Sequence, residues 1–347
     1  MAIRTQTRPQ DGALNMAEIS VLLPVYNGAA YLDETLASLR QQDFSAFEVL
    51  CIDDCSTDDS RAVIQRHADA DDRITYMNTG QNLGSAAKAV NFAAPHATGR
   101  WFVYSSQDDL FSPDWLSQLH ARAVETGADA VLPDVVFYHR DGAEDRRITG
   151  YRGDRTAILS GREAFVASLD WTIPGNALWP MRLLKTNGFD DFNAFADEYT
   201  VRRFFLACDS IAFCEGVFFY RQDNAAAITK GPSAARLDAA DASLRLWQLI
   251  CDNDFGPDVH GPFALRTLRA AIRAQAIVFN APHLASEMPR LTEVWRAMHC
   301  SEAFQTSLAA SGSSAFKRSV YQRAVRSHAW FLRLARLSAL MARRKSR

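Results

Sequence analysis

Several features are missing from the 347-residue sequence, and each absence excludes a class of protein. No run of 18 apolar residues occurs, so the sequence predicts no transmembrane helix. The six cysteines are scattered, without a CxxC pair or a zinc-binding spacing, which is typical of reduced thiols in a cytoplasmic protein. The N-terminal stretch has no apolar segment of the signal-peptide kind. We therefore expect a cytoplasmic protein in which residues 1–17 form a disordered lead-in.

Strong positive charge and glycine-rich phosphate loops are also absent. The formal net charge is −2, so we expect no nucleic-acid partner. Hydrophobic residues make up 48% and charged residues 22% of the chain, which is ordinary globular usage. No P-loop or dinucleotide-binding glycine pattern occurs, so any bound diphosphate needs another source of positive charge.

The charge is nevertheless unevenly distributed. Residues 317–347 contain ten Lys or Arg and no Asp or Glu, which leaves a net charge of −12 on the rest of the chain. On a helical projection Arg323, Arg326, Arg333 and Arg336 fall within one half of the circumference. This pattern fits a helix at an anionic membrane surface, and it fits nearly as well a helix packed on the rest of the chain.

The first two thirds of the sequence alternate between strand and helix signals. Short apolar runs predict strands at residues 19–23, 47–52, 74–77, 101–104, 130–137 and 216–220. Helical patterns between them predict an α/β fold with a Rossmann-like, mostly parallel sheet flanked by helices. Polar or Pro- and Gly-containing stretches predict loops at residues 139–156 and 171–190. Beyond residue 230 only helical patterns remain, so we predict a first domain at 18–230 and a helical C-terminal region at 231–347.

Two acidic pairs follow predicted strands. Asp53-Asp54 ends the second strand and Asp108-Asp109 follows the fourth, and parallel strands place such ends at the edge where ligands bind. Carboxylates there hold Mg²⁺ or Mn²⁺ with substrate phosphates, or bind ribose and base. Helix capping is the alternative explanation for any such Asp, and we favour it for Asp58 and Asp59.

A family resemblance rests on four segments taken together. These are ISVLLPVYNGAAYLDETLASL at 19–39, VLCIDDCSTDDS at 49–60, NLGSAAKAVNFAAPHATGRWFVYSSQDD at 82–109, and FADEYTVRRF at 195–204. In this order and spacing they resemble the family 2 glycosyltransferases, over about residues 19–222. The resemblance implies a GT-A fold and transfer of a sugar with inversion.

The resemblance also implies which residues form the donor site. The nucleotide-sugar residues it implies are Pro24, Val25, Tyr26, Asn27, Asp53, Asp54, Asn82, Gly84, Lys88, Asp108 and Arg221. The DxD-type motif of the family corresponds to Gln107-Asp108-Asp109, with Gln in place of the first acid. Asp109 is then the implied ligand of a divalent cation, Mn²⁺ or Mg²⁺.

The catalytic base of the family lies in an acidic pair that opens a helix. Alignment places Glu198 at that position, and the reversed order of the pair leaves Asp197 open as the base. Either carboxylate could take the proton of an acceptor hydroxyl. Trp171, Asn176 and Trp179 lie where the acceptor is expected.

The implied function is transfer from a nucleotide-diphosphate sugar to a hydroxyl of a saccharide, lipid-linked or protein acceptor. The family often acts in cell-surface polysaccharide or glycolipid biosynthesis, which favours peripheral contact of residues 317–347 with the inner face of the cytoplasmic membrane. Two alternatives remain open at this point. One is a non-catalytic member that binds a nucleotide sugar or acts as a scaffold in a polysaccharide assembly complex, and the other is a sugar nucleotidyltransferase.

Overall fold

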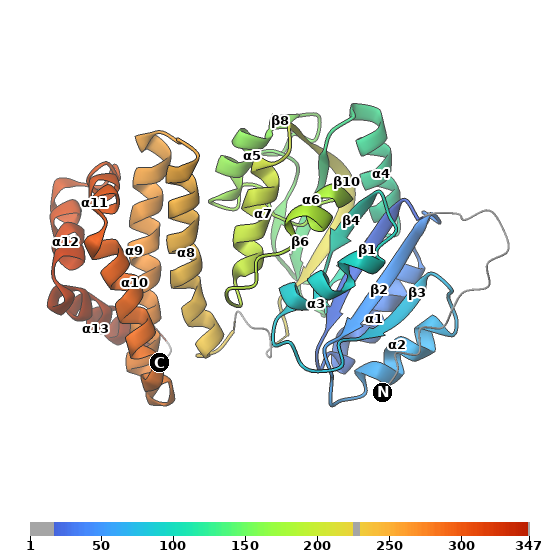
Figure 1. Ribbon diagram of the computed structural model, residues 1–347, viewed down its shortest axis with the longest axis horizontal. Coiled ribbons are helices and arrows are strands. Elements are labelled where there is room, and N and C mark those ends of the chain that lie inside the picture. The colour runs from blue at the N-terminus through green and yellow to red at the C-terminus, as the bar shows by residue number, and fades with distance from the viewer. Residues whose placement is uncertain (1–16, 225–229, 346–347) are drawn as a thin grey trace.

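The computed structural model describes residues 17–224 and 230–345, so almost all of the expected disordered lead-in lies outside the described part. The ten strands there are β1 (Ile19–Val25), β2 (Phe47–Asp53), β3 (Ile74–Asn78), β4 (Trp101–Tyr104), β5 (Leu110–Phe111), β6 (Ala130–Tyr138), β7 (Glu144–Ile148), β8 (Leu159–Ser160), β9 (Trp179–Pro180) and β10 (Ser210–Arg221). They alternate with helices up to residue 206 and give way to helices alone beyond residue 233 (Figure 1).

The α-helices of the described residues number thirteen. They are α1 (Ala29–Arg40), α2 (Ser60–Ala68), α3 (Ala86–Ala93), α4 (Trp115–Thr126), α5 (Gly161–Ser168), α6 (Met181–Asn187), α7 (Ala196–Leu206), α8 (Ala234–Asp252), α9 (Pro257–Asn280), α10 (Met288–Cys300), α11 (Glu302–Ala309), α12 (Ala315–Arg326) and α13 (His328–Lys345). Two short 3₁₀ helices lie at Ala94–His96 and Pro282–Glu287.

The first sheet has the order β3-β2-β1-β4-β9, and all its pairings are parallel except that of β9 with β4. Every residue of β1 and β2 is buried, because helices cover both faces of a parallel sheet. Successive residues of β1 face opposite layers: Val21 and Leu23 pack with α1, α2 and α4, whereas Leu22 packs with α3 and α7.

The second sheet has the order β5-β10-β6-β7, with β8 paired to β10. It joins the first sheet through an antiparallel bridge in which Val131 N donates to Leu178 O (3.1 Å) and Leu178 N donates to Val131 O (2.8 Å). The predicted α/β class with a helical C-terminal region is confirmed, and the strands divide into two joined sheets.

Two of the predicted loops contain regular structure. The predicted loop at 139–156 contains β7, whose first four residues are exposed, so no apolar alternation marks it in the sequence. The predicted loop at 171–190 contains β9 and α6, where Pro180 directly precedes the helix and its fixed φ starts the first turn.

Helices α8–α13 form a separate layer at one end of the molecule, with α8 next to α7 (Figure 1). The rings of Phe165 and Phe255 stack at 4.8 Å between the two parts, and Ala194 N donates to the carboxylate of Asp238 (3.0 Å). The division of the chain near residue 230 stays a prediction.

The basic C-terminal segment is not one helix. Ser327 has an extended backbone (φ −137°, ψ 113°) and separates α12 from α13, so the expectation that four arginines share one helical face is wrong. Helix α13 packs on α9 through the buried side chains of Phe331, Ala335 and Ala339. None of the helices in the described part of the chain is long and apolar enough to cross a bilayer.

Candidate functional site

The ends of β1, β2 and β4 meet at one edge of the first sheet. Val25 and Asp53 are register partners, and Asp54 N donates to Val25 O (2.8 Å). Tyr26 N donates to Gln107 Oε1 (2.8 Å) and Gln107 Nε2 donates to Tyr26 O (3.0 Å). The loops that carry the two predicted acidic pairs are therefore tied to the same β1–α1 loop.

Asp53 is 2% exposed at the end of β2. Its carboxylate accepts hydrogen bonds from Ser56 N (2.9 Å), the hydroxyl of Tyr76 (3.0 Å) and Asn78 Nδ2 (3.3 Å). These bonds fix the carboxylate at the rim of the sheet. One hydrogen bond to Oδ1 leaves capacity for a further donor there, such as a base N–H or a ribose hydroxyl.

Asp54 holds the loop that contains the predicted residues Asn82 and Gly84. Its carboxylate accepts hydrogen bonds from Leu83 N (2.7 Å), Gly84 N (3.1 Å) and Thr79 Oγ1 (3.0 Å). Gly84 has φ +72°, a left-handed conformation that glycine adopts without strain. Asp54 therefore anchors the loop that contains Asn82 and Gly84.

Other predicted donor residues lie on neighbouring loops and helices. Tyr26 is 48% exposed, and Lys88 is half-buried on α3. Asn27 has φ +50°, and its side-chain oxygen accepts a hydrogen bond from Thr57 N (2.8 Å). Pro24 and Val25 are buried in β1, so only their backbone and the residues after them reach the rim.

Asp58 has the capping role that the sequence favours. Its carboxylate accepts hydrogen bonds from Ala29 N (3.0 Å), at the first residue of α1, and from Ser60 N (3.0 Å), at the first residue of α2. One carboxylate thereby satisfies free N–H groups of two helices.

The Asp108-Asp109 pair follows β4 and differs in exposure. Asp109 is 2% exposed, and its carboxylate accepts a hydrogen bond from Arg221 N (3.2 Å). Burial, and next the charge of Asp108, raise the pKa of Asp109 well above its usual range. Asp108 is half-buried and accepts a hydrogen bond from Asn224 Nδ2 (2.7 Å). Asp108 is thus the more accessible carboxylate of the pair.

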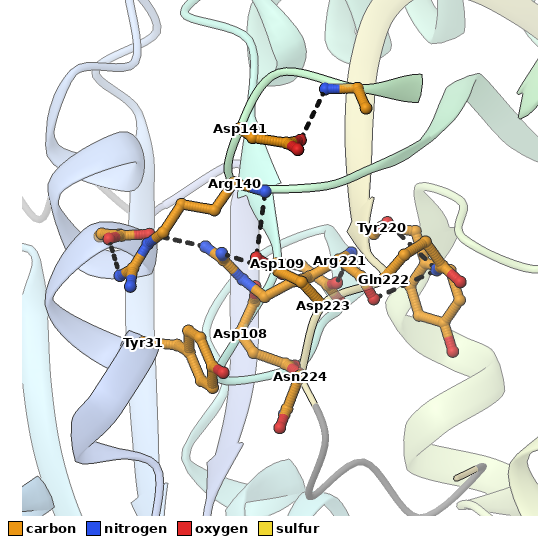
Figure 2. A network of polar contacts seen from close by, with 12 residues as sticks. Tyr31, Asp108, Asp109, Arg140, Asp141, Tyr220, Arg221, Gln222, Asp223 and Asn224 are labelled. Atoms are coloured by element: carbon orange, nitrogen blue, oxygen red, sulfur yellow. Dashed lines mark hydrogen bonds and ion pairs between the residues drawn. The ribbon is translucent and has the colours of Figure 1, made fainter. Parts of the chain in front are cut away.

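Arg221 braces this pair from the end of β10 (Figure 2). Its side chain is 0% exposed, and Arg221 Nε donates to Asp108 O (2.7 Å) while Nη2 pairs with Glu34 (2.7 Å). The guanidinium also stacks on the rings of Tyr31 (4.7 Å) and Tyr138 (5.1 Å). With these partners and full burial, Arg221 positions the acidic loop, and its contact with a nucleotide sugar stays a prediction.

Glu34, Arg140 and Asp223 complete the network, and the sequence analysis assigned none of them to the site. Glu34 on α1 pairs with both Arg221 and Arg140, and Asp223 accepts a hydrogen bond from Arg140 N (3.0 Å). Figure 2 shows Arg140 reaching from the β6–β7 turn toward α1. The one feature of the sequence that could have indicated Glu34 is its i, i+3 spacing from Tyr31, which places the two side chains on one face of the helix.

Asp197 and Glu198 open α7, as predicted, but they have different partners. Glu198 pairs with the buried Arg202 one turn later, and Arg202 Nη2 also donates to Ser168 O (2.9 Å). Burial, and next the charge of Glu198, raise the pKa of Asp197 to about 7. The backbone N–H groups of Glu198 and Asp197, in the first turn of the helix, offset part of this rise in the pKa of Asp197.

Two tyrosines connect this pair with the acidic pair after β4. Burial, and next the charges of Asp197 and Asp109, raise the pKa of Tyr104 well above its usual range. Burial and then the charge of Asp109 raise the pKa of Tyr220, with Asp197 contributing further. The charges of both acidic pairs therefore act on the same two phenols.

The three predicted acceptor residues lie in different surroundings. Trp171 is half-buried with φ +63°, and its ring lies 6.4 Å from that of Phe137. Asn176 is half-buried in the following loop. Trp179 is 1% exposed in β9 and packs on Phe204 at 5.5 Å, so it presents no ring face to an acceptor and belongs to the core.

The residues present fit a divalent cation held partly by substrate. Among the described residues, no group of three or more His, Cys, Asp or Glu side chains is arranged to hold a metal ion. Asp108 and Asp109 present carboxylate oxygens at adjacent positions, and burial, followed by the charge of Asp108, raises the pKa of Asp109. Mg²⁺ and Mn²⁺ are commonly bound by one or two carboxylates together with substrate phosphates.

Comparison with known families agrees with this geometry. The model of the family "Glycosyl transferase family 2" matches residues 20–187, which contain the donor-site loops and the Asp108-Asp109 pair. Residues 20–187 are thus similar to the family 2 glycosyltransferases over nearly half of the chain.

Curated relatives carry the same assignment. The chain is 28% identical over 217 residues to the glycosyltransferase GlyG of Streptococcus pneumoniae, covering 59% of this chain and 70% of GlyG. It is 35% identical over 100 residues to the putative teichuronic acid biosynthesis glycosyltransferase TuaG of Bacillus subtilis, covering 29% of this chain and 39% of TuaG. It is 32% identical over 153 residues to a Campylobacter jejuni GalNAc(5)-diNAcBac-PP-undecaprenol beta-1,3-glucosyltransferase, covering 44% of this chain and 48% of that enzyme.

A solved structure matches nearly the whole chain. Residues 1–349 of Staphylococcus aureus TarS, crystallised in complex with UDP-GlcNAc, superpose with a TM-score of 0.70 and 17% identity. The match covers 94% of this chain and 92% of that one. At this identity the likeness defines the fold, which is GT-A with helices at the C-terminal end.

Proposed function

We propose that the chain transfers a sugar from a nucleotide-diphosphate sugar to an acceptor hydroxyl in one displacement with inversion. The observation that carries this proposal is that the loops of both acidic pairs are hydrogen-bonded to the β1–α1 loop, Asp54 N to Val25 O and the side chain of Gln107 to the backbone of Tyr26. The charges of Asp109 and Asp197 both raise the pKa of Tyr104 and of Tyr220, which supports a common surrounding. The hydrogen bonds between Gln107 and the backbone of Tyr26 connect the rim at Asp53, where the donor would bind, with the loop that carries Asp108 and Asp109. Donor phosphates and a proton acceptor would then lie side by side.

Asp108 and Asp109 would hold the divalent cation together with the donor diphosphate. The cation, when bound, offsets the negative charge that develops on the leaving diphosphate. Arg221 supports this function by fixing the loop through its bond to Asp108 O. Lys88 would add a point charge near the phosphates from α3.

Asp197 is the base that the contacts favour. Its pKa of about 7 gives it both a deprotonated fraction at neutral pH and the basicity to take a proton from an acceptor hydroxyl. Glu198 is held by Arg202, and its charge contributes to the raised pKa of Asp197. We therefore assign proton transfer to Asp197 and positioning to Glu198.

The acceptor belongs to a cell-surface polymer or a lipid-linked precursor of one. Relatives named for teichuronic acid synthesis and for an undecaprenol-linked glycan support this class. Contact with an anionic membrane would suit such an acceptor. Helix α13 supports that contact because Leu337, Leu340 and Met341, each more than half exposed, share a face with Arg333 and Arg336.

Acceptor-independent hydrolysis of the donor tests this function. We expect the chain with Mn²⁺ to release nucleotide slowly from a nucleotide sugar, with UDP-GlcNAc as the first donor to try. Asp109→Asn should reduce release about a hundredfold or more while the circular dichroism spectrum is unchanged. Wild-type activity in Asp109→Asn, or no release and no binding across a panel of nucleotide sugars, contradicts the proposal.

A further inference from the structure

A shallow basic cavity lies beside the loop that carries Trp171. It has a volume of about 310 Å³ and is lined by residues of β7, the turn after it and the 171–172 segment. Its polar lining residues are Arg146, Arg147, Thr149, Arg152 and Thr172. None of these residues belongs to the donor site described above.

The arginines of the cavity are only partly neutralised. Arg147 pairs with Glu144 at 3.3 Å, whereas Arg146 and Arg152 form no ion pair with any carboxylate of the described residues. Arg146 is held in place by donating to Trp171 O (3.0 Å). Arg152 stacks on the ring of Tyr151 at 5.2 Å. Two exposed guanidinium groups thus line the cavity without a protein counter-ion.

Backbone strain is concentrated at this cavity. Arg152 (φ +55°) and Trp171 (φ +63°) are two of only five non-glycine residues with a left-handed backbone in the described part of the chain. Such a conformation costs roughly 1–3 kcal/mol and is most often retained at functional sites. Two others, Asn27 and Cys55, lie on the loops around the donor site. The cavity and the donor site therefore both have non-glycine residues with a left-handed backbone nearby.

One layer of aromatic rings separates the cavity from the catalytic acids. The ring of Phe137 lies 5.4 Å from that of Tyr220, 6.4 Å from that of Trp171 and 5.8 Å from the guanidinium of Arg146. The pKa of Tyr220 is raised by burial, then by the charge of Asp109, and further by that of Asp197. The rings of Trp171, Phe137 and Tyr220 therefore connect the cavity with the surroundings of the acidic residues.

We propose that this cavity binds an anionic group, phosphate or carboxylate, of the acceptor chain. Arg146 and Arg152 would bind the anion through charge-assisted hydrogen bonds while a neighbouring hydroxyl of the acceptor reaches Asp197. This inference rests on the proposed function, because it assigns the acceptor of that same reaction. It makes the substrate a polyanion and excludes a purely neutral glycan.

Binding of model polymers tests the inference without knowledge of the natural acceptor. Titration calorimetry at fixed ionic strength would compare inorganic polyphosphate, polygalacturonate and neutral dextran. We expect Arg146→Gln and Arg152→Gln each to weaken binding of the preferred polyanion about tenfold. Arg100→Gln is the matched control. Arg100 is also exposed, and its guanidinium stacks on the ring of Trp101 at 4.4 Å. It precedes β4, whereas the Asp108-Asp109 pair follows the other end of that strand.

The two polyanions distinguish the source of the charge. Tighter binding of polyphosphate indicates a phosphate-bearing acceptor, and tighter binding of polygalacturonate indicates a carboxylate-bearing one. Dextran bound as tightly as either polyanion, or arginine variants that bind like Arg100→Gln, would overturn the inference. Donor hydrolysis is measured on the same samples. If the wild type does not hydrolyse the donor, the proposed function is contradicted independently of the binding results. If the arginine variants still hydrolyse it, they are folded.

Discussion

At the scale of single residues, the site depends on carboxylates that differ in what surrounds them. Asp54 and Asp58 hold backbone N–H groups, Asp109 is buried beside another acid, and Asp197 has a raised pKa. The same residue type therefore anchors a loop and caps helices, and we propose that it also binds the metal and transfers the proton. Burial and hydrogen-bond partners decide among these roles, and neither can be read from the sequence alone.

Glu34 gives a prediction about the stability of the network around Arg221. Glu34→Gln removes the charge that faces a fully buried guanidinium, so we expect a loss of about 1–2 kcal/mol in the free energy of unfolding, since Glu34 itself is 39% exposed. Urea denaturation measures this loss. Glu293→Gln is the control, because its ion pair with Arg296 is exposed on both sides and should contribute less than half as much. Equal effects of the two changes would show that Arg221 does not depend on Glu34.

At the scale of elements, the site is assembled from loops that follow strands. Gly28, just before α1, allows a close approach of two of these loops, since a Cβ there would lie 2.4 Å from Gln107 Oε1. The absence of a side chain at Gly28 therefore permits the paired hydrogen bonds between Gln107 and the backbone of Tyr26. These bonds connect the β1–α1 loop to the end of β4.

A double-variant cycle tests this connection. Gly28→Ala should displace the Gln107 side chain and cost about 1 kcal/mol of stability, and Gln107→Ala should cost about the same by removing the same two hydrogen bonds. The backbone of Gly28 has φ −102°, which alanine tolerates. The double variant should therefore be no less stable than the worse single variant. Additive losses would mean that the two residues act independently.

The predictability of each element follows from what its side chains contact. β1, β2 and β4 are buried apolar runs, and their positions were predicted to within one or two residues. β7 is a polar, exposed edge strand held mainly by backbone pairing with β6, so its sequence carries no periodic signal. The acidic pairs could be predicted because they directly follow strands. Glu34 could not, because its partner Arg221 lies 187 residues away.

At the scale of the whole molecule, the C-terminal helices are continuous with the rest of the core. The buried residues of α8 and α9 belong to one hydrophobic cluster with those of α3, α5 and α7. Arg266 of α9 also donates to Leu169 O, next to the loop that carries Trp171. The helical region thus supports the segment that precedes Trp171 as well as the basic terminal helices.

The membrane contact proposed for α13 is best tested by surface substitutions. Deleting residues 317–347 would uncover the core around Phe331, which is 0% exposed, so loss of binding would be ambiguous. Leu340→Glu with Met341→Glu changes only exposed positions and adds negative charge to the same face. We expect this variant to lose flotation with anionic liposomes while its thermal stability is unchanged. Phe316→Glu on α12 is the control, and equal flotation of the wild type and the α13 variant contradicts the contact.

The central claim is that Asp197 takes the proton in a site shared with the metal-binding acids, and the pH dependence of donor hydrolysis tests it most directly. In the wild type the rate should rise with pH through about 7 as Asp197 loses its proton. Asp197→Asn should reduce the rate about 10²–10⁴-fold above pH 7, and the rise with pH should disappear. Glu198→Gln removes a charge that raises the pKa of Asp197, so it should retain activity with the rise displaced to lower pH. Loss of activity in Glu198→Gln together with a normal profile in Asp197→Asn would contradict the account.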